Sequence, residues 1–321
     1  MAEQYTYAVA RIHAKEVSLL NGQDLEQLLG CKSADEVTAC LADKGFDCGS
    51  GDTADDIVGR EREKTLKLIS EVVGDMSDFD IFLYENDYHN LKAAVKSVVT
   101  KENPERIFVG DGTVPSEVIK SAVAERDYTA LPPRMAEAAE EAVHVLLETG
   151  DGGLCDMLID KAYLDAVRTA GDDSDSPMIK SYAELTVALA DIRIASRGAR
   201  LGKGAEFFRK SLAECAKLDV SSLGTAAAKG MDELLEYIAC TDYSNAADAL
   251  RESQTALEKW CDDRLMEEIR KERFNQFTIA PIAAYFMARE SELKAVRLIL
   301  TGKQNRLDDS IIRERLRMLY V

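Results

Sequence analysis

Apolar residues recur at helical spacing along nearly the whole chain. Near the start, Leu25, Leu28 and Leu29 fall on one face of a helix. Ser33 then opens the next helix in the pattern S-x-x-E, where a hydroxyl caps a backbone N–H and Glu36 lies three residues further on. The pattern predicts an all-α protein.

Later segments repeat this pattern of inward apolar and outward charged positions. Residues 53–73 predict one helix, and residues 131–150 predict another that begins at a Pro pair and ends in Gly. A long helix is expected from about 279 to 300, closed by Gly302. The one short strand that the sequence suggests is at 106–110.

A short motif occurs three times at equal intervals. It consists of an acid or amide, an aliphatic residue and a base, begins at positions 90, 191 and 292, and so repeats every 101 residues. A further base follows each copy, one position early in the third. The motif alone is common in helical proteins, but its spacing predicts three repeats of about 100 residues, at 1–110, 111–218 and 219–321. The copies are Asn90-Leu91-Lys92, Asp191-Ile192-Arg193 and Glu292-Leu293-Lys294, with the bases Lys96, Arg197 and Arg297 after them.

Charge narrows the range of partners. The chain carries 58 acidic and 40 basic residues, a net charge of −18, which disfavours binding to nucleic acid and to anionic lipid. Residues 264–321 hold 12 Lys/Arg against 8 Asp/Glu, so the last fifth of the chain is basic within an acidic whole. Either this uneven charge is ordinary variation among helix surfaces, or different faces of the protein bind different partners.

Membrane spans, secretion and disulfides are not expected. The longest apolar run, 279–288, is far shorter than the roughly 20 residues that cross a bilayer. The start lacks an apolar signal region, so a cytoplasmic location is expected. The seven cysteines form no CxxC pair and are expected to be reduced thiols. Cys31, Cys40 and Cys48 are spaced by nine and eight residues, unlike zinc knuckles.

Motifs of catalysis and cofactor binding are missing from the sequence. The three histidines do not fall in metal-binding patterns. The stretch 198–204 has three residues between its first two glycines instead of the four of a phosphate loop, and Gly204 replaces the required Ser or Thr. No catalytic, cofactor or metal site is therefore predicted. Glu290 and Lys294, four residues apart, predict a surface ion pair.

Four stretches in this order carry a family resemblance: 5–20, 83–97, 157–171 and, most strongly, 277–321. In the last, a helix that starts at Pro leads into an acid, a basic pair and Gly-Lys. The chain resembles the C subunit of archaeal and bacterial A/V-type ATPases, whose counterpart in eukaryotic V-ATPases is the d subunit. The second and third motif copies depart from the first, since Asp191 and Glu292 replace Asn90.

The resemblance implies a three-lobed, pseudo-threefold, all-α funnel that acts as a rotor part and not as an enzyme. It would couple the central-stalk subunits D and F to the membrane proteolipid ring, as one peripheral copy per complex on the cytoplasmic face. It would thereby transmit torque between ATP hydrolysis or synthesis and proton or sodium transport. No cofactor, nucleic acid or small-molecule substrate is implied.

The repeated bases are the candidate functional residues. They either brace helix against helix or meet acidic residues of the stalk. A generic helical-repeat scaffold of another complex is the alternative function, while an all-helical hydrolase has no support in the sequence. The candidates are Lys92, Arg193, Arg197, Lys294 and Arg297.

Overall fold

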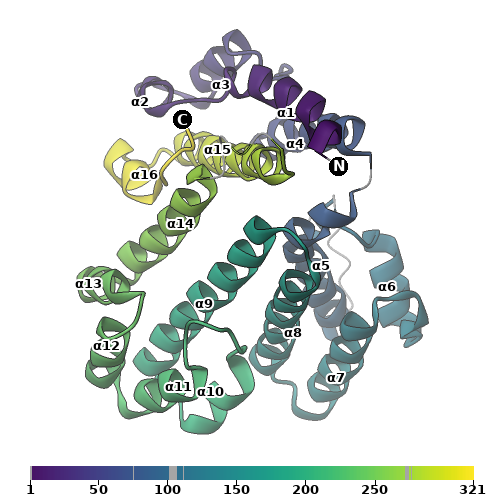
Figure 1. Cartoon of the computed structure of the whole chain (residues 1–321), viewed down its shortest axis with the longest axis vertical. Helices are drawn as coiled ribbons and strands as arrows, with labels where there is room; N and C mark the ends of the chain where they lie inside the picture. Colours follow the sequence, from purple (N-terminus) through teal and green to yellow (C-terminus); the bar gives the residue numbers. More distant parts are fainter. Residues whose placement is uncertain (1, 75, 101–106, 111, 272–274, 276) are drawn as a thin grey trace. The chain divides into compact units, whose positions relative to one another are not determined.

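The protein is all-α, as predicted. A computed structural model describes residues 2–74, 76–100, 107–110, 112–271, 275 and 277–321. Over these ranges the chain forms sixteen α-helices and two short 3-10 helices, and no strand (Figure 1). In the same ranges, no helix combines the length and the apolar character that crossing a membrane requires.

The chain divides into two compact units, one of which is built from both chain ends. Unit 1 comprises Met1–Met76 and Thr255–Val321, and unit 2 comprises Ser77–Gln254. These units are defined by contacts between residues, whereas the predicted repeats are defined by sequence. The units therefore do not test the predicted division at 1–110, 111–218 and 219–321, which stays a prediction.

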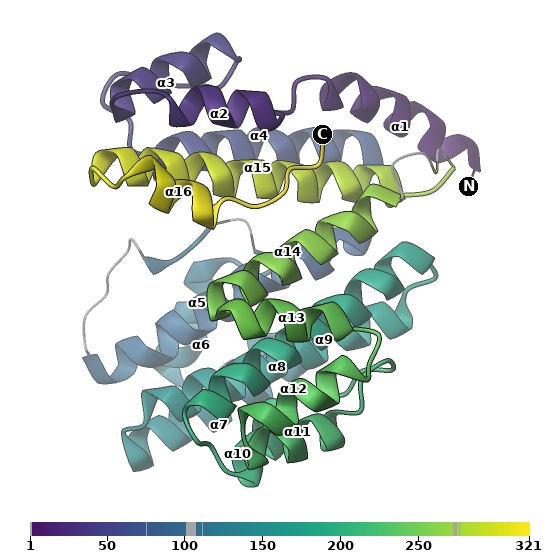
Figure 2. The same ribbon diagram turned by 90° about the vertical axis from the view of Figure 1, so that its left-hand side faces the viewer.

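Unit 1 is organised around a long C-terminal helix, α15. Figure 2 shows α4 and α15 side by side over most of their lengths. The buried core joins α2 and α3 residues such as Leu28, Val37 and Leu41 to α15 residues such as Val296 and Ile299. The helices of this unit are α1 (Ala2–Glu16), α2 (Gly22–Leu29), α3 (Ala34–Asp43), α4 (Ala54–Val73), α14 (Gln254–Lys271), α15 (Ala280–Gln304) and α16 (Asp309–Arg315).

Unit 2 packs its longest helices around α8, which contacts α5, α7, α9 and α10. One of its cores joins Leu91 and Val95 of α5 to Ala139 and Val143 of α7 and to Ile159 of α8. The elements are η1 (Ser77–Phe79), α5 (Asp80–Thr100), α6 (Ser116–Glu125), η3 (Tyr128–Ala130), α7 (Pro133–Thr149), α8 (Gly152–Asp173), α9 (Pro177–Arg200), α10 (Ala205–Ser211), α11 (Val220–Lys229), α12 (Met231–Ala239) and α13 (Ser244–Glu252).

Capping and glycine patterns in the sequence predicted several helix ends correctly. The Ser33 side chain accepts a hydrogen bond from Glu36 N at 3.2 Å, so it caps α3 as predicted. Gly45 follows α3 with a φ of +91°, and Gly150 follows α7 with a φ of +67°. Both angles lie in the region that glycine adopts at little cost.

Two local predictions were wrong. Residues 107–110 form no strand, and Arg106 lies outside the described residues. Side chains of α5 bind the backbone here instead, since His89 Nε2 lies 2.9 Å from Ile107 O.

The glycine at position 302 does not end α15, which continues to Gln304. Gly302 is buried, and a Cβ there would lie 2.6 Å from Ile312 Cδ1. It therefore allows the chain after α15 to pack closely against the helix. The backbone turns at Arg306, whose φ is +55°.

Candidate functional site

The first position of each repeated triplet is a buried polar side chain bound to backbone outside its own helix. Asn90 on α5 accepts a hydrogen bond from Val109 N at 2.8 Å and donates one to Val109 O at 2.9 Å. Asp191 on α9 accepts from Ala213 N at 3.0 Å. All three of these triplet positions are at most 1% exposed. Each such bond fixes a connecting segment to a central helix, because a buried polar group left unbonded is costly.

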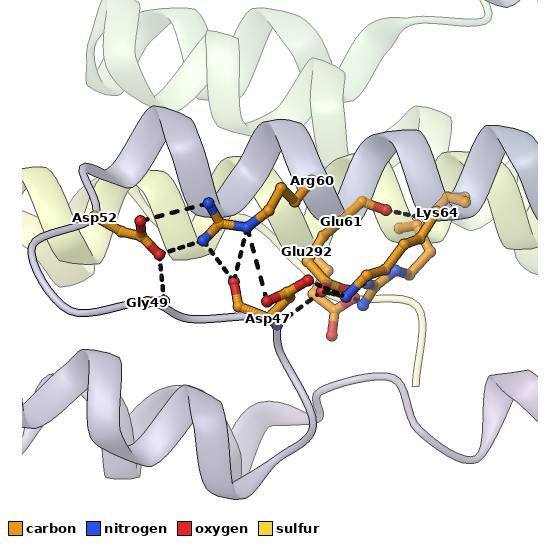
Figure 3. Close-up of polar contacts among 9 residues, drawn as sticks. Asp47, Gly49, Asp52, Arg60, Glu61, Lys64 and Glu292 are labelled. Atoms are coloured by element: carbon orange, nitrogen blue, oxygen red, sulfur yellow. Dashed lines mark hydrogen bonds and ion pairs between the residues drawn. The ribbon is translucent and has the colours of Figure 1, made fainter.

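The third copy belongs to a buried ion cluster in unit 1, whose Glu61 and Glu292 are labelled in Figure 3. Arg289 of α15 donates to Glu61 Oε2 of α4 at 2.7 Å and also binds Glu292 on its own helix. Glu292 Oε1 accepts from Leu20 N at 2.7 Å, and Glu61 Oε1 accepts from Asp47 N at 2.9 Å. The cluster therefore joins three segments that lie far apart in the sequence.

Burial sets the electrostatics of this cluster. Arg289, Glu61 and Glu292 are all less than 10% exposed. Burial raises the pKa of Glu292, and the Arg289 guanidinium opposes part of that rise. Lys64 Nζ lies 2.9 Å from Glu61 Oε1, so Glu61 binds a second cation. Each carboxylate has both a cation and a backbone donor, an arrangement suited to holding segments together and not to proton transfer.

A second, more exposed group of contacts holds the loop before α4. Arg60 Nη2 donates to Asp47 O at 2.8 Å and also binds Asp52, whose other partner is the backbone N–H of Gly49 (Figure 3). The hydrogen bond from Arg60 lowers the pKa of Asp52. Thr53 and Asp56 then form a capping box at the start of α4.

Lys92 and Arg297 are predicted candidates that form ion pairs between helices. Lys92 of α5 binds Asp160 of α8 in unit 2. Arg297 of α15 binds Asp55 of α4 in unit 1, with Nε at 2.7 Å from Oδ1. The Arg297 pair is exposed, with 56% of its arginine side chain accessible, so it contributes little to stability.

The other three candidates are spread over two helices. On α9, Arg193 is half-buried and Arg197 is exposed. Lys294 of α15 is exposed, and its predicted pair with Glu290 does not form. Glu290 binds Arg62 of α4 instead, at 2.8 Å from the guanidinium Nε. A planar guanidinium on the facing helix offers a carboxylate two donors, which a lysine on its own helix does not.

Sequence reasoning missed the buried members of the cluster. Arg289, Glu292, Val296 and Ile299 follow one another at intervals of three or four residues, so the two charged residues share a helix face with the two core residues. This spacing was the signal in the sequence that could have revealed a buried ion pair.

Comparison with known proteins matches the chain almost end to end. A sequence model described as "ATP synthase (C/AC39) subunit" matches residues 8–315. The chain is 23% identical to the C subunit of the V-type sodium ATPase of Enterococcus hirae, over 96% of this chain and 97% of that protein. It is 24% identical to the C subunit of the V-type ATP synthase of Thermus thermophilus, over 95% of each. It is 22% identical to the C subunit of the A-type ATP synthase of Thermococcus kodakarensis, over 97% of this chain and 89% of that protein. On this match the chain belongs to the ATP synthase (C/AC39) subunit family.

Proposed function

We propose that this chain is a non-catalytic rotor subunit of a V/A-type ATPase. It couples the central-stalk subunits D and F to the membrane proteolipid ring and transmits torque between ATP hydrolysis or synthesis and proton or sodium transport. One copy is bound peripherally on the cytoplasmic face of the membrane. The observation that carries the proposal is the family match over residues 8–315, with relatives that are themselves named as C subunits of such complexes.

The internal construction supports a part that must resist deformation. Close-packed helices transmit strain because protein interiors are poorly compressible. In unit 1, the Arg289 cluster ties α4 and α15 to the backbone at Leu20 and Asp47. A torque adapter requires this kind of cross-linking between segments more than it requires a reactive group.

The three buried triplet positions support the proposed threefold repeat and three-lobed funnel. On α5, α9 and α15, the same motif position binds the backbone of a connecting segment. In the third copy that segment comes from the start of the chain, at Leu20. The last repeat is thus completed by N-terminal residues.

The repeated bases act mainly as braces in this proposal. The Lys92–Asp160 and Arg297–Asp55 pairs both join neighbouring helices. The uneven charge along the sequence supports two unlike interfaces, one for the stalk and one for the ring.

Capture of the tagged chain from detergent-solubilised membranes of its own cells, with the captured subunits identified by mass spectrometry, tests the function. We expect proteolipid, D and F subunits. Capture of a different assembly without ATPase subunits would favour the helical scaffold.

Charge reversal separates bracing from stalk binding. Arg297→Glu breaks an interhelical pair, whereas Lys294→Glu reverses an exposed charge on the same helix. Bracing predicts that Arg297→Glu lowers thermal stability slightly more than Lys294→Glu does and that both variants still bind the stalk subunits. Loss of stalk binding at unchanged stability would assign Arg297 to the interface.

A further inference from the structure

Two of the seven cysteines face each other in unit 1. The sulfur atoms of Cys31 and Cys40 lie 3.7 Å apart. Cys31 follows α2 and Cys40 lies near the end of α3, so the contact joins the two helices. The structure has both as free thiols.

The geometry brings this pair close to bonding distance. A disulfide holds its sulfur atoms about 2.05 Å apart, so these two must approach by roughly 1.7 Å. The eight residues between them, 32–39, comprise a short turn and the first part of α3, which limits how far the two cysteines can separate. Cys48 packs against the same core and lies on a different segment, after α3, which makes it a matched comparison.

We propose that Cys31 and Cys40 form a dithiol site that hydrogen peroxide oxidises to an intramolecular disulfide. The site is independent of the rotor function, since it involves neither the ion cluster nor the repeated bases.

The oxidation takes two displacement steps. In the first, the Cys40 thiolate attacks one peroxide oxygen and the O–O bond breaks. The departing hydroxide takes up the proton that the Cys40 thiol lost, which yields one water and a sulfenic acid. In the second, the Cys31 sulfur attacks the Cys40 sulfur, the S–O bond breaks and a second water leaves with the Cys31 proton. Two thiols are oxidised by two electrons, and one peroxide is reduced to two waters.

The surroundings assign the order of attack. Cys31 is 8% exposed, whereas Cys40 is half-buried and easier for peroxide to reach. Burial, together with Cys40, raises the pKa of Cys31 to about 11, so Cys31 stays protonated near neutral pH. Cys40 therefore reacts first and Cys31 resolves the intermediate. Because little Cys31 thiolate is present, the second displacement is slow.

Oxidation would fasten the end of α2 to α3. Leu28 and Leu29 of α2 and Val37 and Leu41 of α3 belong to the unit 1 core. A covalent link beside these residues restrains the helix pair without adding bulk to the core.

Tryptic peptide mapping of the chain identifies which cysteines are joined by a disulfide. Lys15, Lys32, Lys44 and Arg60 place Cys31, Cys40 and Cys48 in three separate peptides, 16–32, 33–44 and 45–60. Native protein is treated with peroxide, alkylated and digested without reductant. We expect peptide 16–32 joined to 33–44, release of both by dithiothreitol, and loss of two of the seven thiols in a denaturing thiol titration.

Variants and alternative products decide the outcome. Cys40→Ser should abolish the cross-linked peptide, and Cys48→Ser should leave it unchanged. The proposal is overturned if peroxide consumes only the exposed Cys240, if Cys48 takes a place in the bond, or if non-reducing gels show the link between two chains instead of within one.

Discussion

Replacing Asp191 by asparagine should remove a pH dependence from the stability of unit 2. Asp191 is fully buried, and one of its oxygens accepts from Ala213 N at 3.0 Å. Burial raises the pKa of this carboxyl from 3.8 to about 8, so the folded protein holds it as a neutral acid at pH 7. Asparagine has the same shape without a titrating proton, and Asn90 already occupies the matching position in the first triplet.

The sign and size follow from proton linkage. Between pH 4 and pH 8 the folded state binds the Asp191 proton and the unfolded state does not. The free energy of unfolding therefore falls as pH rises, by up to about 1.4 kcal/mol per pH unit, and levels off above the folded pKa. Between pH 5 and pH 8 the loss reaches about 4 kcal/mol as an upper value. The asparagine variant should not show this slope.

Charges around Asp191 offset the rise of its pKa only partly. Lys161 of α8 favours the ionised form, whereas Asp165 of α8 and Glu184 of α9 oppose it. Lys161 is already engaged, since its Nζ donates to Leu212 O at 3.0 Å and lies 3.5 Å from Asp165. Burial thus dominates the balance.

The assay is urea unfolding of wild type and Asp191→Asn at several values between pH 5 and pH 9. Hydrogen exchange of unit 2 peptides reports the relevant unit, because the single tryptophan, Trp260, lies in unit 1. Asp172→Asn, at an exposed acid of α8, serves as the control and should preserve the wild-type slope. Equal stability differences at pH 5 and pH 8 between wild type and Asp191→Asn would refute the reasoning.

Two further predictions concern unit 1, where Trp260 fluorescence is the probe. Arg289→Ala should cost about 3–5 kcal/mol because it leaves the buried Glu292 without a cation and Glu61 with Lys64 alone. Arg297→Ala on the same helix should cost at most about 1 kcal/mol, and equal losses would contradict this prediction. Gly302→Ala should cost about 1–3 kcal/mol because its methyl group meets Ile312. Gly59→Ala, on an open face of α4, should instead stabilise by up to about 1 kcal/mol. A neutral Gly302→Ala would show that α16 moves aside at no cost.

Helix class and several helix ends were predictable because local rules govern them. Ser33 caps its own helix, and Gly150 ends one by adopting a positive φ. Position 302 differs because its neighbour Ile312 decides the outcome, and no local rule contains that contact. The strand predicted at 106–110 is likewise replaced, over residues 107–110, by backbone that binds side chains of α5.

The triplets were visible in the sequence, but their contacts were not. Each triplet begins at a buried polar residue, at 90, 191 or 292, that binds backbone, whereas the predicted functional residue was the base two positions later. Whether Glu292 faces solvent or core depends on which segment covers α15, and that segment begins 272 residues earlier, at Leu20. Spacing within one helix cannot supply this information.

The two-ended origin of unit 1 sets an order for biosynthesis. Leu28 and Val37 pack against Val296 and Ile299, which are translated much later. At 5–20 residues per second, the nascent N-terminal helices wait on the order of tens of seconds for those partners. Unit 2 is continuous in sequence and can finish first. Newly made chains therefore expose the apolar surface of the N-terminal helices until these partners are made. A holding chaperone would bind that surface.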